Sequence, residues 1–393
     1  MSRNEPATGS SPNAPIETLA DARAWLARVG AAHALAIDTE GDGMFRYRTQ
    51  LCTVQLCAVS AGEPAEHAIC VIDTLRVPAA PLLRAALGPD GPQKIIHDAS
   101  FDARILFAHG VVLGNVFDTA VAARFLGFSS TGLSSLLLKL FDVNLPKHQQ
   151  QADWGKRPID AEAMRYLEDD VRFLPALYER LLSEVRARDI EAEVQEECRY
   201  LLGEAQRPEL VEPAWMRLKG AAQRAPRERA RLVELAEARE QLARERDLPP
   251  ARLLASDLLL RLSQDDAADP ATLQRLLGNK LEFAPAFAAA LARAQGVADA
   301  PRDQLERLLP ESPSPAELTR RKRRKAWLSD FRAREAQARG VDLQVVLPGH
   351  CLADLVELAS FDEQSLRALP GFGDCRFVRY GQTLLGLPKA LGE

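Results

Sequence analysis

The stretch Leu35-Ala36-Ile37-Asp38-Thr39-Glu40 decides the fold of the first half of the chain. It is a short apolar run that ends in two carboxylates one residue apart, and the turn residues Gly41-Asp42-Gly43 follow it. Such a pattern predicts a buried strand. Because alternate side chains of a strand lie on one face, Asp38 and Glu40 are expected to point the same way. Two adjacent carboxylates repel each other unless a cation lies between them, and such oxygen ligands suit Mg²⁺ or Mn²⁺.

The simpler interpretation of this pair is a solvated acidic turn, but two later stretches favour a metal site. Residues 94–106 (KIIHDASFDARIL) predict a strand, a short turn and the start of a helix that carries Asp102. Residues 166–170 (YLEDD) lie in a helical pattern, where Tyr166 and Asp170 share a face because they are four residues apart.

Asp38, Glu40, Asp102 and Asp170, with Tyr166, form the DEDD exonuclease pattern in its tyrosine variant, and here the chain resembles ribonuclease D. The resemblance covers residues 15–205 and includes 118–120 (DTA), 153–154 (DW) and 157–158 (RP). It implies a ribonuclease-H-like α/β exonuclease domain, with a mixed sheet flanked by helices. Each motif is weak alone, but three in this order and spacing are specific.

The family mechanism implies two divalent ions, Mg²⁺ or Mn²⁺, about 3.5–4 Å apart. By the resemblance, Asp38 bridges both ions, Glu40 and Asp170 complete one site, and Asp102 holds the other. Tyr166 positions the attacking water, because its ordinary pKa of about 10 makes it a poor base near neutral pH.

Three neighbouring residues are expected to be structural. Asp98 belongs to the turn at the strand end, His97 makes a structural hydrogen bond, and Asp118 caps the helix that starts at Thr119. Consecutive strands at 34–37, 51–59 and 68–72 predict an antiparallel meander, and residues 161–188 predict one long helix.

Composition bounds the class of protein. A chain of 393 residues that is 47% hydrophobic and 27% charged predicts two or three soluble globular domains, and no apolar run is long enough for a membrane span. Residues 1–14 are polar and predict a disordered tail, not a signal peptide. Six cysteines without metal-ligand spacing indicate reduced thiols in the cytoplasm. Nothing in the sequence indicates a protein partner.

Beyond the Pro/Glu-rich segment 204–213, no strand pattern is found. Residues 215–220 (WMRLKG) and 247–249 (DLP) resemble parts of an HRDC domain, which predicts one all-α HRDC-like domain over residues 214–300. Residues 369–373 (LPGFG) and 379–381 (RYG) resemble the end of another, which predicts a second over 313–393.

The net charge of −5 does not favour nucleic-acid binding, so affinity must come from local basic patches or from metal ions. In loop 144–160 the candidate RNA contacts are Lys147, Lys156 and Arg157. The alternative is a structural role for this loop, in which Trp154 packs it against the protein and Arg157 pairs with a local acid. The basic run 320–325 points all round a helix and favours phosphate contacts over ion pairs, although it can also be a solvated helix start. Its candidate contacts are Arg320, Arg321, Arg323 and Arg324.

The resemblance therefore implies a 3′→5′ exoribonuclease that releases nucleoside 5′-monophosphates and trims RNA 3′ ends, such as those of transfer-RNA precursors. One alternative is a DNA 3′→5′ exonuclease, a branch in which histidine typically replaces the tyrosine; no histidine lies near Asp170. The other is an RNA-binding protein on an inactive nuclease fold, against which the complete set of four carboxylates and Tyr166 argues.

Overall fold

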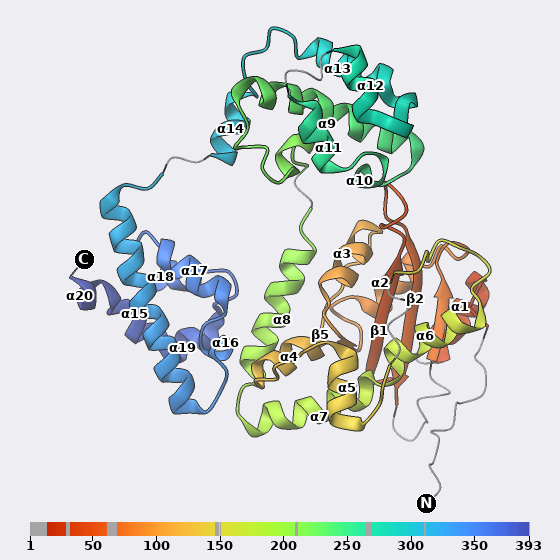
Figure 1. Cartoon of the computed structure of the whole chain (residues 1–393). Coiled ribbons are helices and arrows are strands. Elements are labelled where there is room, and N and C mark those ends of the chain that lie inside the picture. The colour runs from red at the N-terminus through yellow and green to blue at the C-terminus, as the bar shows by residue number, and fades with distance from the viewer. Residues whose placement is uncertain are drawn as a thin grey trace, which may run out of the picture. The chain divides into compact units, whose positions relative to one another are not determined.

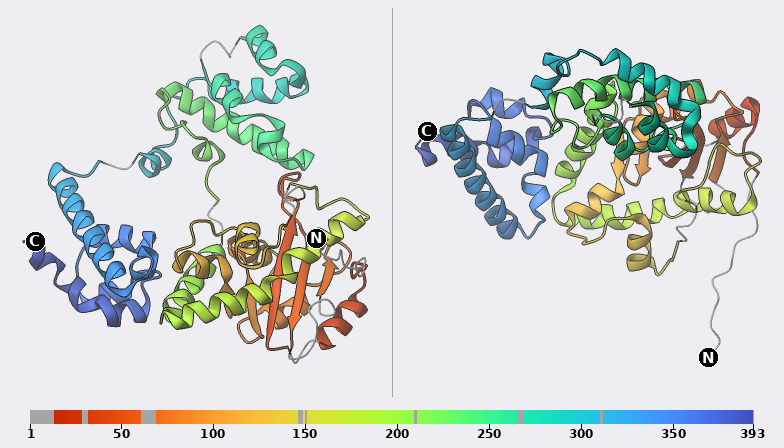
Figure 2. Two further views of the ribbon diagram at one scale, coloured as in Figure 1. Left: turned by 60° about the horizontal axis from the view of Figure 1, so that its bottom comes forward. Right: turned by 45° about the horizontal axis from the view of Figure 1, so that its top comes forward.

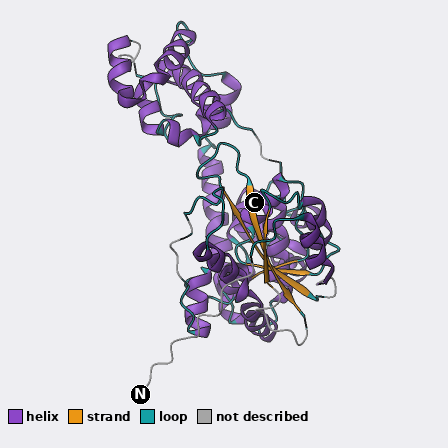
Figure 3. Ribbon diagram, turned by 90° about the vertical axis from the view of Figure 1, so that its right-hand side faces the viewer, coloured by secondary structure: helices purple, strands orange, loops and turns teal. Residues whose placement is uncertain are grey.

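A computed structural model describes residues 14–28, 32–60, 69–145, 149, 151–208, 211–264, 269–309 and 312–392 (Figure 1). The chain divides into two compact units. Unit 1 comprises Met1–Gly41, Leu51–Arg207 and Pro315–Glu393, and unit 2 comprises Asp42–Gln50 and Pro208–Ser314. Among the described residues all five strands lie in unit 1, and unit 2 contains helices and loops alone (Figure 3). No described helix combines the length and apolarity needed to cross a bilayer.

Unit 1 is built on a mixed sheet with the strand order β3-β2-β1-β4-β5. The strands are β1 (Ala34–Gly41), β2 (Leu51–Val59), β3 (Ile69–Asp73), β4 (Gln93–Ile96) and β5 (Val116–Asp118). β1, β2 and β3 pair antiparallel, which confirms the predicted meander, whereas β4 and β5 are parallel to β1. The predicted mixed α/β fold is therefore confirmed, and β1 is its central strand.

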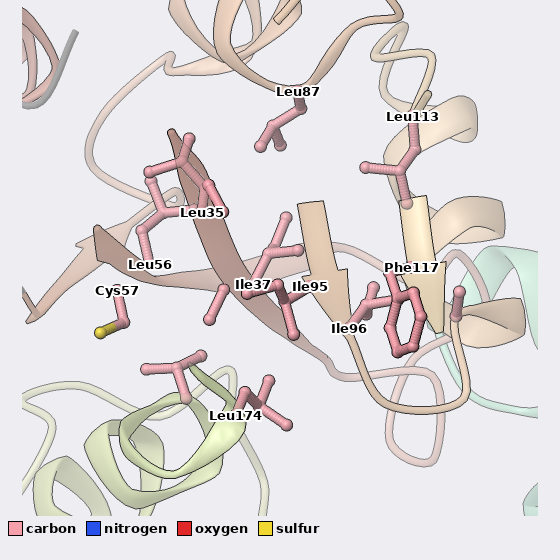
Figure 4. Close-up of a cluster of buried hydrophobic side chains, with 14 of the residues drawn as sticks. Leu35, Ile37, Leu56, Cys57, Leu87, Ile95, Ile96, Leu113, Phe117 and Leu174 are labelled. Atoms are coloured by element: carbon pink, nitrogen blue, oxygen red, sulfur yellow. The ribbon is translucent and has the colours of Figure 1, made fainter. Parts of the chain in front are cut away.

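Both faces of the sheet are covered, which explains why its strands read as nearly continuous apolar runs. Figure 4 shows the side chains of β1, β2, β4 and β5 packed between Leu87 on one side and Leu174 on the other. The helices of this part are α1 (Leu19–Arg28), α2 (Ala80–Leu87), α3 (Ser100–Ala108), α4 (Thr119–Phe125), α5 (Leu133–Phe141), α6 (Ala161–Arg172), α7 (Leu174–Ala187) and α8 (Glu191–Ala205).

The prediction of one helix over residues 161–188 is wrong. α6 ends at Arg172, and α7 begins at Leu174 with Pro175 in its first turn. A continuous helix would place the ring of Pro175 against the carbonyl of Val171 and would lose one backbone hydrogen bond. The break lets α6 and α7 follow different lines over the sheet.

Unit 2 packs around α9, and its core includes the buried Trp215, Leu235 and Phe287. Its helical segments are η2 (Ala214–Arg217), α9 (Pro226–Arg246), α10 (Pro250–Leu253), α11 (Ser256–Leu262), α12 (Pro270–Leu277), η4 (Gly278–Phe283), α13 (Ala284–Arg293) and α14 (Arg302–Leu308). The connection between β1 and β2 belongs to this unit. Its Arg46 donates to Asp247 at 2.8 Å, and Arg252 lies over the ring of Phe45 at 4.3 Å.

The C-terminal helices belong to unit 1 and gather along the long helix α15 (Figures 1 and 2). They are α15 (Pro315–Arg339), α16 (Leu343–Val346), α17 (Gly349–Glu357), α18 (Glu363–Arg367), α19 (Gly373–Leu385) and α20 (Leu387–Leu391). They contact α8 through its buried acidic residues Glu193, Glu196 and Glu197. The respective partners are Arg339 at 2.9 Å, the backbone N–H of Cys375 at 2.8 Å and His350 at 3.1 Å.

The approach of α19 to α8 requires a glycine at residue 373. Gly373 has φ +72, and a Cβ built on it would lie 2.2 Å from the carboxyl carbon of Glu196. The same carboxylate accepts a hydrogen bond from the fully buried Arg376 at 3.4 Å. A side chain at residue 373 would therefore displace a buried ion pair.

We predict that Gly373→Ala destabilises unit 1 more than Gly127→Ala. Gly127 has a similar φ of +82 but nothing within 4 Å of its Cβ position, so its substitution carries only the backbone cost of about 1–2 kcal/mol. Displacing Glu196 from Arg376 adds up to about 3–5 kcal/mol, the cost of breaking a buried ion pair. Thermal melts of the full chain measure the difference, and equal midpoints for the two variants would show that α19 does not bear on Glu196.

Candidate active site

The paired carboxylates of β1 and the face of α6 meet at one point of unit 1. The pleat of β1 places Asp38 and Glu40 on the same side of the strand, and α6, which contacts β1, carries Asp170. One carboxylate oxygen from each of Asp38, Glu40 and Asp170 lies within 4.8 Å of the others. Residues more than a hundred positions apart in sequence thus form one acidic cluster.

Asp102 joins this cluster from the first turn of α3. Its Oδ1 accepts a hydrogen bond of 2.6 Å from the hydroxyl of Thr39, the residue between Asp38 and Glu40. Asp118 caps α4 as predicted, with its side chain accepting from the N–H groups of Ala120 and Val121. It also accepts from the N–H groups of Asp98 and Ala99 at 3.1 and 2.9 Å, which fixes the turn that leads into α3.

The four acidic residues and Tyr166 line one cavity of about 430 Å³. That size lies within the range of about 300–1,000 Å³ common for ligand sites. The ring of Phe101 is 48% exposed and forms part of the wall, as do Arg124 and Ser134. His97 also lines it, but its Nδ1 is 2.9 Å from the hydroxyl of Thr119, which is the predicted structural hydrogen bond.

Burial raises the pKa of every carboxyl group in the cluster, and charges within the cluster raise the pKa values of Asp38, Glu40 and Asp170 further. Burial comes first for Asp38, whose pKa is well above its usual range, and the charges of Asp102, Asp170 and Glu40 raise it further. For Glu40, burial and then the charges of Asp170 and Asp102 raise the pKa to about 9. Burial raises the pKa of Asp102 and of Asp170 to about 7, although hydrogen bonds from Thr39 and Tyr166 oppose the rise. Without a cation the cluster therefore keeps protons near neutral pH, because full ionisation would bring unbalanced negative charges together.

Such a cluster fits divalent cations. All donors are carboxylate oxygens, which Mg²⁺ and Mn²⁺ prefer, and a cation removes the repulsion that raises the pKa values. Asp38, Glu40 and Asp170 can reach a common ion because their oxygens are already grouped.

Tyr166 lies beside the cluster as a neutral donor. Burial raises the pKa of its hydroxyl, and the charges of Asp170, Glu40 and Asp38 raise it further. The hydroxyl also donates a hydrogen bond to Asp170. It therefore keeps its proton throughout the physiological pH range, which suits orienting a water molecule better than removing a proton.

The basic residues of the loop before α6 have different surroundings. Lys156 is exposed, and Lys147 lies outside the described residues. Arg157 pairs with Asp73 at 2.6 Å, and Trp154 is buried, as the alternative interpretation of this loop expected. Arg157 thus has a structural role.

The basic run also differs from the expectation that its cations avoid ion pairs. Arg320 and Arg321 both pair with Glu317, at 2.6 and 3.0 Å, and Arg323 donates to the carbonyl of Leu391. Arg324 is buried and donates to the carbonyl of Leu358 at 2.6 Å. The prediction of an RNA contact at Arg324 is therefore wrong, because its guanidinium holds the helical fold together.

Two residues of the cavity, Thr39 and Phe101, and the residue Asp73 that pairs with Arg157 have no role predicted from the sequence. The pleat of β1 separates Thr39 from its acidic neighbours, so only the structure shows its bond to Asp102. Phe101 precedes Asp102 in the sequence, and its place in the cavity wall is shown only by the structure. Asp73 ends a short apolar strand, and that position is the one sequence signal that could have indicated it.

This arrangement is that of a 3′–5′ exonuclease domain, and known families match both parts of unit 1. Residues 13–186 match the 3′-5′ exonuclease family, and residues 324–387 match the HRDC domain.

Curated ribonuclease D sequences show the particular family. That of Jannaschia sp. is 31% identical over 291 residues, 72% of this chain and 74% of its own length. That of Nitrobacter hamburgensis is 26% identical over 389 residues, 95% of this chain and 97% of its own. A similar solved structure is the crystal structure of Escherichia coli RNase D, an exoribonuclease involved in structured RNA processing. The match has a TM-score of 0.69 and 23% identity, and it covers 96% of this chain and 99% of that chain. The chain belongs to the ribonuclease D family and is a 3′→5′ exoribonuclease.

The raised pKa values predict that metal-free protein loses stability as pH rises. Between the ordinary pKa values of 3.8 and 4.5 and the folded values of about 7 and about 9, the folded state binds protons that the unfolded state has released. Stability therefore falls with rising pH through this window.

Thermal melts in EDTA from pH 5 to 9 measure the fall. Mn²⁺ should restore the midpoint chiefly at high pH, and Asp38→Asn should flatten the profile; a flat wild-type profile would contradict the prediction.

Proposed function

We propose that this exoribonuclease hydrolyses the 3′ ends of structured RNAs, such as transfer-RNA precursors, with two divalent ions, Mg²⁺ or Mn²⁺. The observation that carries the proposal is the group of Asp38, Glu40 and Asp170 oxygens within 4.8 Å, with Asp102 and Tyr166 in the same cavity. Of the family members, E. coli RNase D is described as processing structured RNA, which supports this substrate class.

In the proposed mechanism the carboxylates hold the ions and the protein supplies position. Asp38 would serve both ions, Glu40 and Asp170 would complete one site, and Asp102 would hold the other. When bound, two such ions neutralise the phosphate, activate water and stabilise the leaving oxygen. Thr39 occupies one oxygen of Asp102, so that the other is left for a ligand role.

Tyr166 orients the attacking water in this proposal. Its protonated hydroxyl donates to Asp170, which leaves the hydroxyl oxygen to accept a hydrogen bond from the attacking water. A fixed line of attack is the chief contribution that such a group makes.

The helical regions extend the substrate surface in this proposal. We propose that residues 214–300 and 313–393 are HRDC-like domains after the exonuclease domain 15–205. Arg320, Arg321 and Arg323, together with Lys156, remain candidate phosphate contacts.

We predict that Asp102→Asn and Asp170→Asn abolish hydrolysis. Even the outer partners of metal ligands contribute about 10–100-fold to such sites, so a lost ligand should cost more. The matched control is Asp169→Asn, because Asp169 pairs with Arg172 at 3.0 Å and is not among the residues that line the cavity.

The assay uses end-labelled RNA and DNA oligomers with free or blocked 3′ ends. Digestion of only free-ended RNA supports the proposal. Equal digestion of DNA would favour a DNA exonuclease, and binding without digestion would favour an inactive nuclease fold. Wild-type rates for Asp102→Asn would overturn the ligand assignment.

Tyr166→Phe is predicted to lower kcat about tenfold to a hundredfold by releasing the attacking water, with little change in KM. Single-turnover digestion and the rise in Tm caused by Mn²⁺ separate turnover from metal affinity. An equal loss of RNA affinity would instead mean that the ring contacts the substrate.

A further inference from the structure

The loop before α6 is fixed to the sheet by Arg157. The guanidinium has five N–H donors, and each has an acceptor. Nε and Nη2 donate to the two oxygens of Asp73 at 2.6 and 2.8 Å. Nη2 also donates to the carbonyl of Cys52 at 2.9 Å. Nη1 donates to the carbonyls of Trp154 and Lys156, both at 2.7 Å. Asp73 is fully buried at the end of β3, so the anchor is rigid.

What this anchor holds in place is the ring of Trp154. Trp154 is 4% exposed and packs with Cys52, Val71, Met164 and Leu167. Its ring stacks on Tyr166, with centroids 5.7 Å apart and planes at 29°. Its buried Nε1 has no acceptor among the described residues, so the indole is held by packing and not by a hydrogen bond.

Tyr166 is therefore confined from two sides. Its hydroxyl bonds Asp170, and its ring rests on Trp154. Two contacts at opposite ends of one side chain restrict its rotation about both χ angles. An aromatic contact of this kind contributes beyond the area it buries.

We infer that Asp73, Arg157 and Trp154 form a brace that sets the orientation of Tyr166, and that all three are positioning residues for hydrolysis. None of them is among the acidic ligands, and Arg157 acts through the ring of Trp154. The inference rests on the proposed function, because it assumes that the hydroxyl of Tyr166 orients water.

The test is a double-mutant cycle in the full chain. Trp154→Leu removes the ring, and Trp154→Phe is the conservative control, because it keeps a stacking ring and loses no hydrogen bond. Each is made with Tyr166 and with Tyr166→Phe. The readouts are kcat and KM on a short unstructured RNA at saturating Mn²⁺, and the rise in Tm that Mn²⁺ causes.

We expect Trp154→Leu to lower kcat on the order of tenfold, the scale of a misplaced catalytic group, with KM and the Mn²⁺ shift unchanged. Trp154→Phe should retain most of the activity. In the Tyr166→Phe background, Trp154→Leu should lower kcat by less than about twofold relative to Tyr166→Phe alone. The effects of two residues that act through one group are not additive.

If the double variant lost kcat by the product of the two single losses, the inference would be overturned, since Trp154 would then act independently of the Tyr166 hydroxyl. A Tyr166→Phe variant with wild-type kcat would instead overturn the proposed role of Tyr166, whatever Trp154 does. Arg157→Lys repeats the cycle from the other end of the brace and keeps the charge opposite Asp73. If neither Trp154→Leu nor Arg157→Lys folds in the presence of Mn²⁺, the contacts serve folding alone and the inference fails.

Discussion

The repulsion among four carboxylates, one buried and three half-buried, is the constraint on which the rest of unit 1 depends. Water would screen these charges, but the cavity withholds much of it, so their pKa values rise and the metal-free cluster opposes folding. The surrounding sheet must therefore be stable enough to hold the cluster together. The central position of β1, paired on both sides and covered on both faces, provides that support.

Each member of the site is held by neighbours that do not belong to the acidic cluster. Thr39 holds one oxygen of Asp102, and Asp118 organises the turn before α3. Across the sheet, Arg157 ties the loop that carries Trp154 to Asp73. These contacts are short and buried, which is the expected way to keep a catalytic arrangement within narrow limits.

Buried charge recurs where α8 meets the C-terminal helices, but there it is compensated. Glu193 and Glu196 face arginines and a backbone N–H, so their charges are largely satisfied within the protein. Among the described residues no ion pair joins Asp38, Glu40, Asp102 or Asp170 to a basic side chain, although Arg124 lines the same cavity. The same residue type therefore serves folding at one place and suits cation binding at the other.

The sequence by itself determined the meander and the shared faces of Asp38 with Glu40 and of Tyr166 with Asp170, because strand alternation and helical spacing are local properties that a side-chain pattern records. The family followed from the resemblance of the acidic motifs. The helical pattern alone did not predict the break between α6 and α7, although the proline at residue 175 is consistent with it. The pattern also did not predict the burial of Arg324. It also left open whether Arg157 faces RNA or an acid. Only the tertiary structure decided that, because Asp73 and Arg157 are 84 residues apart and meet only when Arg157 packs at the end of β3. Contacts between distant segments depend on packing, and no local pattern specifies them.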